Sequence, residues 1–225
     1  MKLFATINGH RVTTASLHVP YAGMWIADVE LDTAVQLSGA ATVELGALEL
    51  RGTVVPEHTG IFGATSVARV IAGAGGWSRS VAAKHYHNDA GVTAATVALD
   101  TAQAVGETLD VSGAAGRIIG IDFVRAAGPA SRVLEQLLPS TPWWVDYQGT
   151  TRTGVRAQIE LEANAYELLS FDPRDKLATL ALDDPGAVVI GSVLRARLAR
   201  PLVVRQLDIE VSKGALRAYA WGVEL

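Results

Sequence analysis

Residues 25–32 read WIADVELD, and this stretch decides the fold. One set of alternate residues is wholly apolar, whereas the other set includes Asp28, Glu30 and Asp32. Successive side chains of a strand point to opposite faces, so an alternation with a period of two predicts a β-strand. One face of this strand is expected to enter a core, and the other is expected to be mostly polar.

Short apolar runs on either side of this stretch predict further strands. An Asn8-Gly9 pair, which is typical of hairpin turns, separates the first two. The alternation in residues 42–50 slips by one residue near Gly46, which favours a single bulged strand. Strands at such short spacing indicate a barrel or roll. The expected strands lie at residues 3–7, 12–19, 25–32, 42–50, 53–55 and 66–72.

The glycine-rich run AGAGG at residues 72–76 marks a break, and Trp77 follows it. A phosphate-binding loop would need a helix immediately after it. A strand is expected instead at residues 81–87, so we interpret the run as a hinge or a tight turn between elements.

The clearest helix is predicted at residues 93–105. Ala95, Leu99 and Ala102 share one face, and Gly106 stands where a C-terminal cap belongs. A strand at residues 118–124 is expected next.

A second short helix is expected after that strand. Pro129 would take its first helical position, which suits a residue without an N–H, and Pro139 would end it.

The last third of the chain returns to strands. Residues 143–147 and 150–156 predict a hairpin, and residues 158–161 are expected to extend its second arm. The final two strands predict another hairpin, with Lys213-Gly214 at its turn. The expected later strands are residues 166–171, 177–182, 187–194, 202–211 and 216–223.

Together these elements predict a β-rich α+β protein in which two tube-like β-barrel or roll regions flank a small helical segment. The first β region is expected at residues 1–76, the mixed segment with two short helices at 77–142, and the second β region at 143–225.

The composition excludes several classes of protein. The chain has 225 residues, of which 49% are hydrophobic and 19% are charged, below the roughly 25% charge of typical soluble domains. It has no cysteine, which excludes disulfides, a thiol nucleophile and cysteine-ligated metals. No apolar stretch approaches the about 20 residues of a membrane span, and no signal peptide is evident, so cytoplasmic folding is expected.

Charge is distributed unevenly. The net charge of −4 argues against a general nucleic-acid binder, and residues 1–110 carry all of it. Arginine makes up 15 of the 19 basic residues, which suits protein interfaces, although codon bias explains it equally well.

The sequence contains one candidate metal motif, His85-x-His87-x-Asp89. Alternate residues of a strand share a face, so these three side chains could converge on Zn, Fe or Mn. A polar strand end that runs into a turn is the alternative. No Gly-x-Ser-x-Gly motif is present, and no catalytic residue or cofactor site is predicted.

Aromatic and arginine residues supply candidate interface positions. Trp143 and Trp144 would point to opposite faces of one strand, so one of them needs a surface beyond the core unless the strand is buried on both faces. Arg195 and Arg197 would share a strand face that either meets an acidic neighbour, such as another copy, or simply stays solvated. The candidate interface residues are Trp143, Trp144, Arg152, Arg156, Arg195 and Arg197.

Two stretches, ATINGHRV at residues 5–12 and WWVDYQGTTRTGVR at residues 143–156, carry a family resemblance together with the order of elements. The chain resembles the baseplate or tail hub proteins of contractile-tailed bacteriophages, of the late-control type. This resemblance covers most of the chain.

The resemblance implies a structural virion protein without an active site, metal or cofactor. Such hubs are homotrimers whose paired β-barrel domains imitate a six-fold ring. They join the tail tube to the central spike, contact other baseplate proteins, and let tape-measure protein and DNA pass. The implied location is the tail baseplate of the virion, after assembly in the host cytoplasm and without membrane insertion.

Two other functions compete with this hypothesis. One is a metal-dependent enzyme or metal-binding protein that uses His85, His87 and Asp89. The other is a carbohydrate-binding β module of a tail tip that stacks sugars on Trp143 or Trp144.

Overall fold

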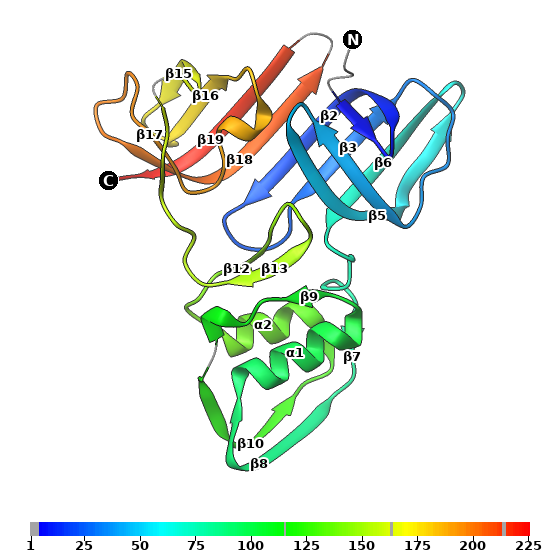
Figure 1. Cartoon of the computed structure of the whole chain (residues 1–225), viewed down its shortest axis with the longest axis vertical. Coiled ribbons are helices and arrows are strands. Elements are labelled where there is room, and N and C mark those ends of the chain that lie inside the picture. Colours follow the sequence, from blue (N-terminus) through cyan, green and yellow to red (C-terminus); the bar gives the residue numbers. More distant parts are fainter. Residues whose placement is uncertain (1–4, 115, 163, 213–214) are drawn as a thin grey trace.

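The computed structural model describes residues 5–114, 116–162, 164–212 and 215–225. Most of its strands gather at one end of the molecule, and the described α-helices lie at the other end beside a two-stranded ribbon (Figure 1). A short hairpin lies between the two ends. No helix in the described ranges has the length and apolar character needed to cross a bilayer.

The first β region is a closed barrel of six described strands. They are β1 (Ala5–Ile7), β2 (His10–Pro20), β3 (Ile26–Leu31), β4 (Ala40–Leu45), β5 (Leu48–Phe62) and β6 (Thr65–Ala72). The antiparallel order is β1-β4-β5-β6-β3-β2, and pairing of β1 with β2 closes the ring. Leu17, Trp25 and Leu50 are almost inaccessible to solvent inside it. The predicted β-rich fold is therefore confirmed.

The stretch at residues 25–32 behaves as its alternation predicts. Trp25, Ala27, Val29 and Leu31 are buried in the barrel. The side chain of Asp28, between them, faces outward and is exposed.

The interpretation of residues 42–50 as one bulged strand is wrong. Leu45 pairs with Leu48, so β4 and β5 form a hairpin around a tight turn. Gly46 has a φ of +59°, a left-handed conformation that glycine adopts without steric cost. The bulge of this region lies further along β5, between Val54 and Thr59.

The middle of the chain forms a small α/β unit. Its β8 and β10 make the antiparallel two-stranded ribbon, and α1 and α2 pack together above it (Figure 1). The elements are β7 (Ser80–Val81), β8 (Lys84–Thr93), α1 (Ala94–Val105), β9 (Thr108–Leu109), a 3-10 turn (Ser112–Ala114), β10 (Ile118–Arg125), β11 (Gly128–Pro129) and α2 (Ala130–Leu137).

Helix α1 begins at Ala94, one residue later than predicted, and ends at Val105 as predicted. The Thr93 side chain accepts a hydrogen bond from the Thr96 N–H at 3.1 Å, and Gly106 ends the helix. Of the three residues predicted to share a face, Ala102 is buried and Leu99 is 45% exposed, so that face is only partly buried. The buried residues follow the helical i, i+3, i+4, i+7 pattern, which begins at Ala94 and not at Ala95. They are Ala94, Val97, Ala98, Thr101, Ala102 and Val105.

Helix α2 ends before Pro139, as predicted. Pro129 is the cap residue that precedes the first helical residue, and not the first helical residue itself.

The predicted hairpin after residue 142 is present but shorter than expected. Its strands are β12 (Trp143–Val145) and β13 (Thr150–Thr153), and β13 pairs in parallel with β9 of the middle unit. Residues 158–161 do not extend this hairpin. Instead β14 (Ile159–Glu160) pairs in parallel with β17 (Ser192–Leu194), because the chain leaves the hairpin after Thr153.

The second β region is a roll. Its strands are β14, β15 (Glu167–Asp172), β16 (Leu177–Ala181), β17 (Ser192–Leu194), β18 (Leu202–Ser212) and β19 (Ala215–Glu224), with a 3-10 turn at Pro185–Ala187. The order is β18-β19-β16-β15, with β17 on the other side of β18. The predicted Lys213-Gly214 turn lies outside the described residues.

The barrel and the roll share one sheet. Strand β18 pairs antiparallel with β2 over six residues, from Gln206 opposite Pro20 to Val211 opposite Ala15. The outer face of the barrel therefore continues into the outer face of the roll without a break in the hydrogen bonding.

The glycine-rich run after β6 is held in place by the side chain of Glu107. The buried Glu107 carboxylate accepts hydrogen bonds from the Gly76 N–H at 2.6 Å and the Ala74 N–H at 3.2 Å. Burial raises the pKa of Glu107, although these N–H groups oppose the effect. The run is thus a tight connection whose amides bind the protein's own carboxylate.

Candidate functional site

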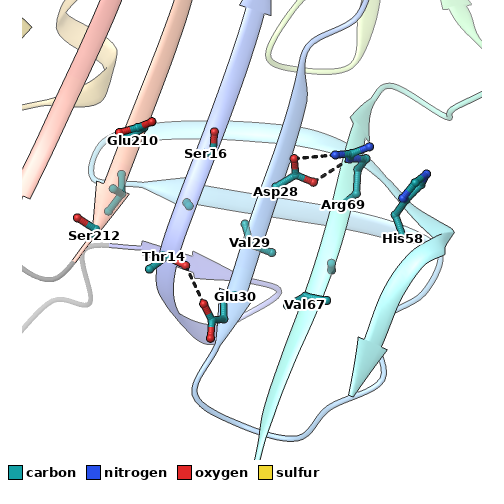
Figure 2. Close-up of a pocket in the computed structure, with 13 residues that line it drawn as sticks. Thr14, Ser16, Asp28, Val29, Glu30, His58, Val67, Arg69, Glu210 and Ser212 are labelled. Atoms are coloured by element: carbon teal, nitrogen blue, oxygen red, sulfur yellow. Dashed lines mark hydrogen bonds and ion pairs between the residues drawn. The ribbon is translucent and has the colours of Figure 1, made fainter. Parts of the chain in front are cut away.

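The candidate site is the outer face of the sheet where the barrel meets the roll. We call this surface the seam face and define it by the outward residues of β6, β3, β2 and β18. The strand registers align Arg69, Asp28, Ser16 and Glu210 in one row. A neighbouring row aligns Val67, Glu30 and Thr14. Figure 2 shows these side chains around an open groove of about 440 Å³.

Two side-chain interactions order the groove. Arg69 donates to both carboxylate oxygens of Asp28, from Nε at 2.7 Å and from Nη2 at 3.0 Å (Figure 2). This hydrogen-bonded pairing raises the pKa of Arg69. The Thr14 hydroxyl donates to Glu30 at 3.2 Å.

Acidic groups outnumber arginines around the groove of the seam face, where Asp28, Glu30 and Glu210 stand with Arg69. The Asp208 carboxylate lies 2.6 Å from Nδ1 of His18, and the Tyr219 hydroxyl of β19 donates to Glu210 at 3.5 Å. Four carboxylates therefore face outward near the seam, and Arg69 is paired with one of them, Asp28. The carboxylates are Asp28, Glu30, Asp208 and Glu210.

The groove offers polar contacts and no arrangement of nucleophile and base. Ser16 stands beside Asp28 and Glu210, and the His58 side chain stands at the rim, apart from the serine (Figure 2). Across the described ranges, no group of three or more His, Asp or Glu side chains is placed to hold a metal ion.

The structure places the predicted metal residues on the ribbon. His85 and His87 do share a face of β8, and each contacts Asp122 of β10, at 3.1 Å from His85 Nε2 and 2.8 Å from His87 Nδ1. Asp89 lies 3.2 Å from His87, with its side chain 98% exposed. The hydrogen bond from His87 lowers the pKa of Asp122. Sequence reasoning missed Asp122 because only the strand register reveals it.

The two tryptophans of the hairpin have different surroundings. Trp143 is 7% exposed and packs against Trp77 with ring centroids 5.7 Å apart. Trp144 is half-buried, and the Arg156 guanidinium lies 4.8 Å from its ring centroid. The predicted opposite orientation is present, and Trp143 has no free ring face for a sugar.

Two of the predicted arginines are paired within the chain. Arg152 contacts Asp146 at 3.0 Å and Asp110 at 2.6 Å. Arg195 forms two hydrogen bonds with Glu160, at 2.9 Å and 2.7 Å. These carboxylates hold the pKa of both guanidiniums above the usual range.

The expectation that Arg195 and Arg197 share a strand face is wrong. Strand β17 ends at Leu194, and Arg197 adopts a left-handed φ of +59°. The turn therefore separates the two side chains.

No protein-family model matches this sequence, and no curated protein matches it either. The likeness to known proteins is therefore one of structure.

Three solved structures share the fold over nearly the whole chain. A 43 kDa tail protein of prophage MuSo2 from Shewanella oneidensis is 11% identical, with a TM-score of 0.66 over 98% of this chain and 95% of that chain. The tail protein from Neisseria meningitidis MC58 is 10% identical, with a TM-score of 0.61 over 96% and 94%.

The third structure is the E. coli c3393 protein, a type VI secretion system component described as structurally similar to the T4 tail proteins gp27 and gp5. It is 10% identical, with a TM-score of 0.66 over 98% of this chain and 79% of that chain. The fold of this chain is thus the fold of these tail and secretion proteins.

Proposed function

We propose that this chain is a structural hub subunit of a phage tail or a related injection apparatus, and that three copies form a ring whose channel is lined by the seam face. The observation that carries the proposal is the single sheet that runs through both β regions. It presents polar and acidic side chains on one side and the core on the other.

The ring is the arrangement that the hub resemblance implies, and the number of β regions in one chain is compatible with it. Each copy supplies a barrel and a roll, so three copies supply six similar units, the number that matches a six-fold tail tube. In this proposal residues 1–76 and 143–225 form the wall, and residues 77–142 stand outside it. The shared fold of the prophage tail proteins supports this arrangement.

Contacts between copies require apolar surface on both β regions. The tip of the β5–β6 hairpin exposes Ile61 and Phe62, and Phe62 is 67% exposed. The roll exposes Ile159, Leu169 and Val223. In a cyclic ring, each copy contacts its neighbour through two different surfaces. We therefore expect the exposed apolar patch on the barrel of one copy to pack against the exposed apolar patch on the roll of the next.

An acidic lining suits a channel through which DNA passes. Carboxylates repel the phosphate backbone, so they keep the moving strand from binding to the wall. The proposed role is structural, with neighbours in the tail tube, the spike and the rest of the baseplate.

The test is the oligomeric state of the purified chain, measured by multi-angle light scattering and native mass spectrometry across a range of concentrations. We expect a trimer, and we expect Phe62→Asp to shift it to monomer. Leu99→Asp is the matched control, because Leu99 is an exposed apolar residue on α1, outside the proposed wall.

Particles that remain monomeric at all concentrations and with neighbouring tail proteins would overturn the proposal. Equal loss of assembly in both variants would overturn the assignment of the contact.

A further inference from the structure

Four side chains from separate segments form a stack that the ring proposal does not use. The Arg156 guanidinium carbon lies 4.8 Å from the Trp144 ring centroid and 6.0 Å from that of Tyr21. The Arg205 guanidinium carbon lies 4.2 Å from the same Tyr21 ring. We call these four residues the arginine–aromatic stack. Two cations thus contact one tyrosine ring.

The fold holds this stack in place from both sides. The Gly23 N–H donates to the Trp143 carbonyl at 2.7 Å, and the Val145 N–H donates to the Gly23 carbonyl at 3.1 Å. These bonds fix the segment after β2 alongside β12. On the other side, a bulge in β18 between Val204 and Gln206 sets Arg205 beyond the end of β2.

The stack is short of negative charge. Within the described ranges, no carboxylate forms an ion pair with Arg156 or Arg205. Arg156 donates from Nη2 to the Pro20 carbonyl at 3.2 Å, whereas its buried Nε has no hydrogen-bond partner. A buried hydrogen-bond donor without a partner costs free energy. The chain supplies a carboxylate to Arg152 and to Arg195, whereas none is paired with Arg156 among the described residues.

Burial also lowers the pKa of Arg156 to about 10, and the group stays charged at neutral pH. The guanidinium therefore keeps a positive charge at a site where burial makes that charge unfavourable. An anion bound beside it would stabilise the charge.

We propose that the arginine–aromatic stack binds an aspartate or glutamate side chain of an acidic segment on another protein. Guanidinium groups pair with carboxylates through two parallel N–H donors. Val155, next to Arg156, is 79% exposed and offers apolar contact beside the charge. Clustered tyrosine, tryptophan and arginine are the residues that dominate protein–protein binding energy. The inference does not rest on the ring, because neither Arg156 nor Arg205 lines the groove of the seam face.

The probe is an acetylated and amidated tetraglutamate peptide, titrated into the intact chain at low salt. Binding is followed by calorimetry and by the NMR signals of the arginine Nε–H groups. We expect saturable binding that shifts the Arg156 signal, and about a tenfold or greater loss of affinity in Arg156→Gln and in Arg205→Gln. Arg174→Gln is the matched control, since Arg174 is an exposed arginine in the turn after β15.

Thermal unfolding separates binding from folding. Without peptide, Arg156→Gln is expected to melt at the same temperature as the wild type or higher, because it removes a poorly partnered buried charge. A large fall in its melting temperature would assign Arg156 a structural role and overturn the proposal.

Three other results would also overturn it. One is the absence of saturable peptide binding, and another is a loss of peptide affinity in the Arg174→Gln control equal to that in Arg156→Gln. The third is tighter binding of a single-stranded oligonucleotide or of inorganic phosphate than of the peptide at the same ionic strength, which would assign the stack to phosphate.

Discussion

The barrel and the roll are built from similar strands, yet their edges are closed differently. Every strand of the barrel has a partner on each side, because β1 pairs with both β2 and β4. In the roll, β15 ends the described sheet and pairs only with β16. An unpaired strand edge is a template for another chain. The barrel is thus complete by itself, whereas the roll leaves an edge for a neighbour.

The largest expected effect comes from matched cavities in the two regions. Leu50 of β5 and Leu180 of β16 are both fully buried. We expect Leu50→Ala to cost about 4–5 kcal/mol of unfolding free energy and Leu180→Ala about 2–3 kcal/mol, because an open roll relaxes into the cavity more easily than a closed barrel. Urea unfolding measures both changes, and equal costs would remove the proposed difference in rigidity.

Two strand glycines offer a second matched pair. A Cβ on Gly52 would lie 2.4 Å from the Ile71 carbonyl oxygen, and a Cβ on Gly222 would lie 2.5 Å from the Val203 carbonyl oxygen. Overpacking of this kind costs about 1–3 kcal/mol. We expect Gly52→Ala to cost more than Gly222→Ala, because strands of a closed barrel cannot shift apart. Thermal unfolding of the two variants gives the comparison, and the reverse order would contradict it.

The connection after the barrel is expected to respond to pH. Glu107→Gln leaves one acceptor oxygen where two receive N–H groups, so a cost of about 1–2 kcal/mol is expected. The folded pKa of Glu107 is raised, so protonation of this group favours folding. Its contribution is full below the unfolded pKa and is lost as pH rises through the folded pKa.

The stability advantage of the wild type over Glu107→Gln should therefore shrink as pH rises from acid to neutral. Urea unfolding at several pH values measures it. An advantage that grows with pH would contradict the raised pKa.

The smallest effect on stability is expected at the open edge. Leu169 of β15 is exposed, so Leu169→Lys should change the unfolding free energy by less than about 0.5 kcal/mol. It should nevertheless weaken self-association, since a lysine on an edge strand opposes pairing with another chain. Sedimentation velocity reports the association, with Leu99→Lys on α1 as the control. Unchanged association would show that this edge is not used.

Local pattern predicted much of the fold. The alternation at residues 25–32 identified the buried and outward faces of β3, and Gly106 located the end of α1. These signals work because they depend on neighbouring residues alone. The predictions failed where a second segment decides the outcome, as at residues 158–161, which pair with β17 instead of the hairpin.

The candidate site was less accessible to sequence reasoning. Asp28 and Glu30 were evident as polar residues of a strand, but their neighbour Glu210 lies about 180 positions further on, and only the β2–β18 pairing joins them. Arg156 was selected as an interface residue, but nothing in the sequence indicated that Tyr21 and Arg205 belong to the same cluster.

The sequence by itself determined most of the strands, the two helices, the polar face of β3 and the absence of cysteine chemistry, because each follows from the period, the caps or the composition of a short segment. Only the tertiary structure decided which strands close into a barrel, which edge stays open and which guanidiniums lack a carboxylate. These outcomes depend on contacts between residues far apart in the chain, and such contacts form when the whole core is buried together.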